Sequence, residues 1–330
     1  LTPTQRADVE AAARADAPRH REWEQVGHEL GWGFFSIGTQ LKVERLVEYD
    51  GDVFLTVEIA DSLAGKLDET VTGSLLELSV GGTTAYQLTM RFSSMDELEE
   101  TLDDIDDALL PGNPDIPWWA PGQRQTIEFS HQTELELAQR LEKHQDHVVG
   151  DVRSHGLTTD ASVLEGLFEA GATRSVGVDR NSGNTVVSGE VRTVLSIGQV
   201  VPDAVTLFAG DVGAARKDSV ELDPDGTVVS RTTTTTVSAA AGAVEIGTPR
   251  GGVTLGTDHG TQVVHSVTTD AEGRTTEMVV LADTEVERFG FDLAPDPRYP
   301  RASLSYEAGE AVTTRVYVRG DDGTWHEVTP

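Results

Sequence analysis

The sequence predicts an α+β fold in which antiparallel β-sheets are packed by a few amphipathic helices, with a β-rich C-terminal half that forms a twisted antiparallel meander. Two observations predict the sheets: apolar and polar residues alternate over 41–92, and short Val/Thr-rich runs separated by turns follow from about 174. The third observation is the helical spacing of apolar residues after Ser94. Because 330 residues are many for one core, we expect an α+β domain over 1–150 and a mostly antiparallel β domain over 151–330.

The first 30 residues are predicted to form two helices. Thr4 is suited to cap the first helix, because a run of alanines follows it and nothing breaks that run. Pro18 is suited to open the second helix, since proline is favoured at the first helical position. The apolar face of this second helix would consist of Trp23, Val26 and Leu30.

Residues 53–59 show the clearest strand pattern in the chain. Val53, Leu55, Val57 and Ile59 fall on one face, with polar residues on the other. The preceding YDGD has the composition of a tight hairpin turn. Two further runs, at 75–80 and 86–92, are predicted to pair around a Gly-Gly turn, which gives a sheet with one buried and one wet face.

An amphipathic helix is predicted over 94–109. Its start carries the capping box formed by Ser94 and Glu97. Its many carboxylates are interpreted as a solvated face rather than a metal site, because they lack the converging carbonyl oxygens of a calcium loop. Its apolar residues, spaced to cover a sheet, are Met95, Leu98, Leu102, Ile105 and Leu109.

The first domain contains a predicted duplication. TMRFSSMDELE at 89–99 matches TIEFSHQTELE at 126–136, and each leads into a helical pattern. We therefore expect a strand-helix unit used twice, over 89–109 and 126–148. The second domain is predicted to hold one short helix at 160–170 and then hairpins. Their turns are DRNSGN (179–184), DPDG (223–226), DAEG (270–273) and GDDG (320–323).

Composition excludes several classes of function. The chain has 56 acidic and 25 basic residues, a net charge of −31, so it should repel nucleic acid and anionic membranes. It has no Cys, which excludes disulfides and thiolate chemistry. No stretch of apolar residues is long enough for a membrane helix, so no membrane insertion is expected.

Two pairs of residues are candidates for a binding site. His144 and His147 form an H-x-x-H pattern that could bind a divalent cation, with Asp146, Asp151 and His155 nearby; the alternative is that His144 lies in the core. No other cofactor is expected. Trp118 and Trp119 lie among prolines and could form a platform for a glycan or peptide, or could pin this connector to the domain.

No catalytic signature is present. The sequence has no G-x-S-x-G, no phosphate-binding loop and no dinucleotide fingerprint, so we do not expect an enzyme. A glycan hydrolase with an unidentified pair of carboxylates remains an alternative, because such a pair can be distant in sequence.

The sequence resembles the non-catalytic regions of large exported actinobacterial proteins of the polymorphic-toxin type, which are linked to WXG-family secretion. The resemblance rests on RFSSMDELEETLDD, a strand that leads into an acidic helix, and on the hairpin TTDAEGRTTEMVV at 268–280. It covers about residues 85–145 and 215–285 and carries no catalytic residue.

This resemblance implies a non-enzymatic structural or interaction module of an exported bacterial protein, with a scaffold or delivery role in a toxin. The alternative is a ligand-binding or adhesion domain that uses its sheets and the Trp118-Trp119 connector. The expected partner is a protein or a cell-surface glycan. The expected location is secreted or at the cell surface, with the cytoplasm left open.

Overall fold

The computed structural model describes most of the chain. The described residues are 17–32, 35–68, 76–99, 141–163, 168–201, 205–248, 251–293, 301–320 and 323–328. Trp118, Trp119, the first predicted helix and residues 126–136 of the predicted duplication lie outside them.

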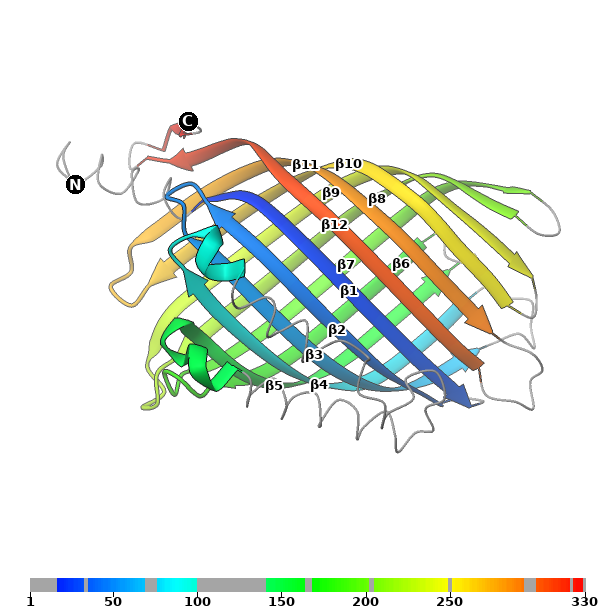
Figure 1. Cartoon of the computed structure of the whole chain (residues 1–330), viewed down its shortest axis with the longest axis horizontal. Helices are drawn as coiled ribbons and strands as arrows, with labels where there is room; N and C mark the ends of the chain where they lie inside the picture. Colours follow the sequence, from blue (N-terminus) through cyan, green and yellow to red (C-terminus); the bar gives the residue numbers. More distant parts are fainter. Residues whose placement is uncertain are drawn as a thin grey trace.

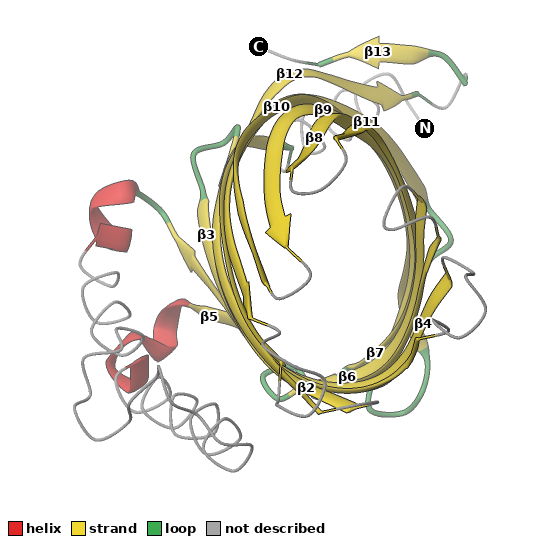
Figure 2. Ribbon diagram, turned by 90° about the vertical axis from the view of Figure 1, so that its right-hand side faces the viewer, coloured by secondary structure: helices red, strands yellow, loops and turns green. Residues whose placement is uncertain are grey.

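Twelve of the described strands form a closed antiparallel β-barrel (Figures 1 and 2). Each strand pairs with the next along the chain, and β12 pairs back with β1, which closes the sheet. A short strand, β13, adds to β12 beyond the point where β1 begins. The strands are β1 (Pro18–Trp32), β2 (Phe35–Glu48), β3 (Val53–Asp68), β4 (Leu76–Phe92), β5 (Val148–Val163), β6 (Phe168–Asp179), β7 (Thr185–Val201), β8 (Val205–Leu222), β9 (Val228–Thr248), β10 (Gly251–Asp270), β11 (Thr275–Leu293), β12 (Arg301–Arg319) and β13 (Trp325–Glu327).

The predicted α+β fold is therefore wrong. Residues 18–30 belong to β1 rather than to a helix, and 76–92 form the single strand β4 rather than a hairpin around glycines. The predicted helix at 160–170 falls in β5 and β6 where it is described. Strand pairing determines the secondary structure of these segments. β1 is hydrogen-bonded along its length to β2 on one side and to β12 on the other. Such tertiary contacts override weak local propensity.

The antiparallel pairing predicted for the C-terminal half is confirmed, and so are the predicted turns. The turns carry a glycine with positive φ at Gly51, Gly183, Gly226, Gly273 and Gly323. Asp223 shows why aspartate precedes such a glycine, because its Oδ1 accepts hydrogen bonds from the backbone N–H of Asp225 at 3.0 Å and of Thr227 at 2.7 Å.

A helix at 95–99 and a 3₁₀ helix, η1 (Leu141–His147), lie outside the barrel beside β4 and β5 (Figure 2). The predicted cap is present: Ser94 Oγ accepts from the N–H of Glu97 at 3.3 Å, and the Glu97 carboxylate accepts from the N–H of Ser93 at 3.1 Å. Within the described residues, no helix has the length and apolar character needed to cross a membrane.

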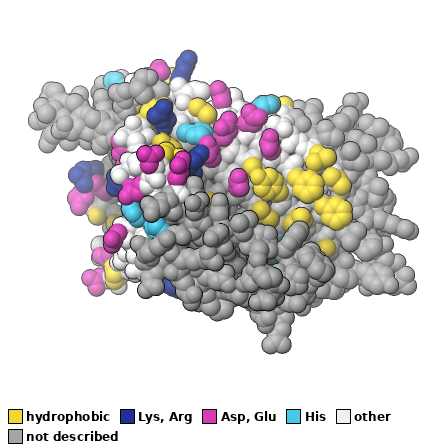
Figure 3. Space-filling model, viewed as in Figure 1, with side chains coloured by type: hydrophobic (Ala, Val, Ile, Leu, Met, Phe, Trp, Pro, Cys, Tyr) yellow, Lys and Arg dark blue, Asp and Glu magenta, His cyan; other side chains and the backbone are white. Residues whose placement is uncertain are grey.

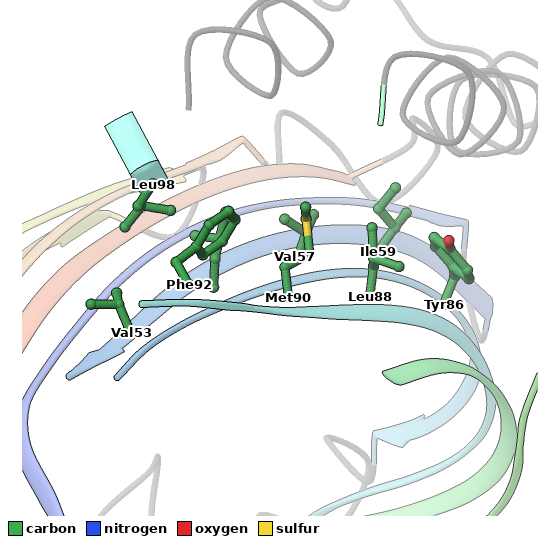
Figure 4. Close-up of a cluster of buried hydrophobic side chains, with 9 residues drawn as sticks. Val53, Val57, Ile59, Tyr86, Leu88, Met90, Phe92 and Leu98 are labelled. Atoms are coloured by element: carbon green, nitrogen blue, oxygen red, sulfur yellow. The ribbon is translucent and has the colours of Figure 1, made fainter. Parts of the chain in front are cut away.

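The first of these helices covers an apolar part of the wall, as its spacing predicted. Leu98 is fully buried against β3 and β4 (Figure 4). Residues from both sides of position 150 belong to the same sheet, since β4 pairs with β5. The buried cluster to which Leu98 belongs also contains Val53, Leu55, Val57, Ile59, Tyr86, Leu88, Met90 and Phe92.

Candidate functional site

The barrel wall has two faces that can be followed from strand to strand. Residues that are directly opposite each other in an antiparallel pair point to the same side of the sheet. The row through β2, β1, β12, β11 and β10 shows this continuity: Leu41 pairs with Val26, Val26 with Tyr306, Tyr306 with Phe289, and Phe289 with Leu255. The same rule places Leu41 opposite Ile59, which points away from the barrel interior (Figure 4). This row therefore lies on the outer face.

The outer face carries the exposed apolar side chains. Apart from Val149 and Trp325, every large hydrophobic residue with an exposed side chain in the described chain lies on this face of a barrel strand. Figure 3 shows a group of such side chains over β1, β11 and β12. The outer-face set is Val26, Leu63, Val80, Leu157, Val176, Val178, Val187, Val191, Leu195, Val212, Val237, Leu255, Val263, Phe289, Phe291 and Val312.

Acidic residues border this apolar surface on the wall formed by β1, β11 and β12. Glu24 and Glu287 are two residues from Val26 and Phe289 on their strands, and therefore on the same face. They help to line an open groove on the outside of the barrel, together with Glu22, Glu285 and Glu310. The change from apolar to acidic within one strand step is typical of a boundary between two environments.

The inner face is lined by small and polar side chains, and these are not packed as a core. Most of its described hydroxyl and amide side chains are half-exposed, whereas a barrel filled by its own side chains would bury them. Buried hydrophobic residues occur on the described inner face only toward the end that holds the chain termini, at Ala17, Val280, Ala282, Ala311, Val316 and Val318. The half-exposed polar set includes Gln25, Gln40, Thr56, Ser62, Gln87, Ser154, Thr158, Thr173, Ser188, Thr234, Ser238 and Gln262.

Charged side chains form a belt along the inner face from β2 to β1. Glu44 accepts from Arg21 at 2.6 Å and from Lys42 at 2.8 Å. The Arg21 guanidinium lies 5.5 Å from the centre of the Trp23 ring, in a cation–π arrangement. Trp23 thus links this pair of strands to the next part of the belt.

The belt continues through β12 and β11 to β10. Trp23 Nε1 donates to Glu307 Oε1 at 3.0 Å, and Arg288 Nε lies 3.2 Å from Glu307 Oε2. Arg288 also forms an ion pair with Asp258, whose side chain is buried. Five adjacent strands are therefore joined by polar contacts on the inner face.

Gly309 allows Trp23 to lie flat against the wall. Trp23 and Gly309 are directly paired across β1 and β12. A Cβ at position 309 would fall within 3.0 Å of three Trp23 ring atoms, closer than real Cβ contacts. The missing side chain keeps the indole out of the lumen.

The structure does not bring His144 and His147 into a metal cluster with other described residues. Their ring centres are 6.4 Å apart. The His147 ring stacks on Phe92 at 4.8 Å, and its Nε2 lies 3.7 Å from Glu97. A metal role for the two histidines, and a binding role for Trp118 and Trp119, remain predictions.

Two other clusters of possible metal ligands occur in the described chain. His20, Glu22 and Glu310 lie together on β1 and β12, with their ligand atoms within 4.8 Å of one another. Glu48, Asp50 and Asp52 lie together at the turn between β2 and β3. The expected divalent cation likewise remains a prediction. Sequence reasoning missed the first cluster because its members are about 290 positions apart in the chain and meet only through barrel closure.

Comparisons with known proteins give only structural matches of low score. No family model matches the chain, and no curated protein matches it in sequence. The chain is similar to the solved beta domain of the Bordetella autotransporter Brka, at 9% identity and a TM-score of 0.39, covering 89% of this chain and 99% of that one. It is also similar to CdiB from Acinetobacter baumannii, at 8% identity and a TM-score of 0.31, covering 88% of this chain and 60% of that one.

A third similar structure is the CymD monoaromatic hydrocarbon channel, at 7% identity and a TM-score of 0.30, covering 93% of this chain and 91% of that one. At these scores, the function has to be argued from the side chains of the barrel itself.

The barrel corrects several predictions about the role of the chain. The resemblance to polymorphic-toxin regions was wrong, because RFSSMDELE is the end of barrel strand β4 with the helix outside it, and 268–280 is the β10–β11 hairpin. The scaffold and adhesion functions were wrong for the same reason: the two halves of the chain close into one wall with a polar interior. The interpretation of the chain as a scaffold built from a structural repeat is wrong for the same reason.

The prediction of no membrane insertion was also wrong in its reasoning. The length of an apolar run tests for membrane helices, whereas a closed barrel satisfies its backbone hydrogen bonds between strands and needs only an apolar outer face. The location of the chain at the cell surface, and the membrane concerned, belong to the proposal below.

Proposed function

We propose that this chain is an integral membrane β-barrel that forms a water-filled pore and mediates transport across an outer membrane at the cell surface. One observation carries the proposal: the exposed apolar side chains lie on the outer face, and half-exposed polar side chains line the inner face. Apolar-out and polar-in alternation is the pattern of barrels that span bilayers and contain water. A water-soluble barrel would expose polar residues on its outer face instead.

The acidic border on the outside of β1, β11 and β12 supports the same placement. Carboxylates are costly in hydrocarbon, so Glu24 and Glu287 should stand at or beyond the membrane–water interface. Val26 and Phe289, one strand step away, should lie within the bilayer.

The test uses two neighbouring residues of β5 that face opposite sides. Leu157 is the most exposed of the outer-face hydrophobics, at 69%, and Thr158 faces the lumen. Leu157→Arg should reduce insertion into liposomes by about 2–4 kcal/mol, because it places a charge in hydrocarbon. Thr158→Arg should insert normally and lower the single-channel conductance in planar bilayers.

The proposal fails if the wild-type protein stays in the aqueous phase without detergent, or gives no conductance in bilayers. It also fails if the two arginine variants insert equally well.

A further inference from the structure

We propose that the lumen is selective for cations, an inference that rests on the pore function proposed above. The observation behind it is an imbalance of charge on the inner face. The basic side chains described there lie beside carboxylates, while several carboxylates have no ion pair with a described base.

The described basic side chains on the inner face lie beside carboxylates. Arg21 and Lys42 share Glu44, and Arg288 contacts both Asp258 and Glu307. Arg192 lies 3.1 Å from Asp160, and Arg91 pairs with Asp52. Among the bases whose side chains are described, the remaining one on the inner face is Lys217, which is directly opposite Glu190 in the β7–β8 register. No inner-face base whose side chain is described therefore stands without a carboxylate beside it.

Several carboxylates on the inner face, in contrast, form no ion pair with a described base. Glu58 on β3, Glu169 on β6 and Asp211 on β8 face the lumen, as their pairing with Gln87, Ser162 and Ser196 shows. Each lacks an ion pair with any base in the described ranges; Lys42, directly opposite Glu58 in the β2–β3 register, contacts Glu44 instead. In addition, the Asp211 Oδ1 atom is buried and has no hydrogen-bond partner there. A carboxylate oxygen that accepts no hydrogen bond favours a cation next to it.

These three carboxylates should attract cations along the lumen rather than at one site. They belong to separate strands, so their negative charge is distributed around the wall rather than gathered at one site. A lumen with low-dielectric walls concentrates the field of such charges, which raises the local concentration of cations and lowers that of anions. The charge belt from Lys42 to Asp258 adds little, because its acids and bases balance.

The experiment measures the reversal potential of the reconstituted pore in a KCl gradient. We expect a cation-to-anion permeability ratio of about ten at low salt, the lower end of the enrichment that charged clefts produce. The ratio should fall as salt is raised, because screening shortens the reach of the wall charges. Replacing the three unbalanced acids, with Glu58→Gln, Glu169→Gln and Asp211→Asn, should bring the ratio close to one.

A matched control removes the same number of charges from the outer face. Glu285→Gln, Glu287→Gln and Glu310→Gln together change the net charge of the protein equally, and they should leave the permeability ratio unchanged. If the inner triple variant does not fold, Asp211→Asn alone should give a smaller shift in the same direction. A conducting wild-type pore with no cation preference, or an equal effect of the two triple variants, overturns the selectivity. A protein that inserts but does not conduct overturns the pore itself.

Discussion

Trp23 keeps its position on the inner wall because its partner in β12 has no side chain. Gly309→Ala should push the indole off the wall and break its hydrogen bond to Glu307, since a Cβ there would overlap the ring. We expect a loss of about 1–3 kcal/mol in the free energy of unfolding, the usual cost of overpacking. Urea unfolding of the detergent-solubilised protein measures it.

The control for this prediction is Gly189→Ala, at a strand glycine whose added Cβ would meet its nearest atom at 3.9 Å. This variant should be close to wild type. In a background without the ring, Trp23→Ala, the Gly309→Ala change should lose most of its cost. Equal destabilisation by the two glycine variants would contradict the account given for Trp23.

Glu97 makes the helix cap sensitive to pH. Hydrogen bonds from the backbone N–H and the hydroxyl of Ser93 hold the pKa of the Glu97 carboxyl below its ordinary value. A lowered pKa in the folded protein means that the ionised cap adds stability above the ordinary pKa of about 4.5, and that this stability is lost as pH falls through the folded value. The wild type should therefore exceed Glu97→Gln in melting temperature near neutral pH.

The gap between these two proteins should close as the pH is lowered from the ordinary value of about 4.5 through the lowered pKa of Glu97, because a protonated glutamate and a glutamine are equivalent. Thermal unfolding followed by circular dichroism at a series of pH values tests this. A gap that is constant with pH would show that the charge of Glu97 has no part in the cap.

At the scale of elements, the hairpins depend on backbone conformation rather than on contacts of the turn residue. Gly226 has a φ of +83°, and a Cβ there would meet nothing within 4 Å. Gly226→Val should still cost roughly 1–2 kcal/mol or more, because a β-branched residue is disfavoured at positive φ. Gly226→Asn should cost much less, since asparagine tolerates this region. Urea unfolding separates strain in the backbone from crowding, and equal stability of the two variants would rule out the strain.

The turns and the strand 53–59 were predictable because their signals are local. Asp-Gly pairs and strict alternation need no information from elsewhere in the chain. β1 was mistaken for a helix because its outer residues change from Glu22 and Glu24 to Val26 and Leu30, so the strand shows no continuous apolar alternation. That change makes sense only when the partner strand β12, near the other end of the chain, places Glu310 beside Glu22 and Tyr306 beside Val26.

The polar lumen could not be read from the sequence for a related reason. A barrel strand gives a much weaker signal than a membrane helix, since only every second residue faces lipid. The charge belt is further hidden because its members are distant in sequence: Trp23 and Glu307 are 284 positions apart and become neighbours only through closure. The candidate sites predicted from sequence were short local motifs, and this network contains none.

At the scale of the whole molecule, closure of β1 on β12 holds the interior together and removes two sheet edges. An open sheet of this length would present unpaired N–H and C=O groups and would invite aggregation. In the closed barrel, Val26 and Tyr306 are directly paired, which brings two positions from opposite ends of the chain to the Cα separation of about 4.5–5.5 Å found for such pairs.

Because the chain has no Cys, an engineered pair reports on this seam alone. Val26→Cys with Tyr306→Cys should form an intramolecular disulfide under mild oxidation, since both side chains lie on the outer face at a distance that a disulfide bridges. Val26→Cys with Ser305→Cys should not, because residue 305 faces the lumen. Non-reducing electrophoresis distinguishes the two, as the cross-linked chain encloses almost the whole sequence in a covalent loop and migrates differently. Cross-linking of both pairs to the same extent, or of neither, would mean that β1 and β12 do not form the closed seam on which the lumen depends.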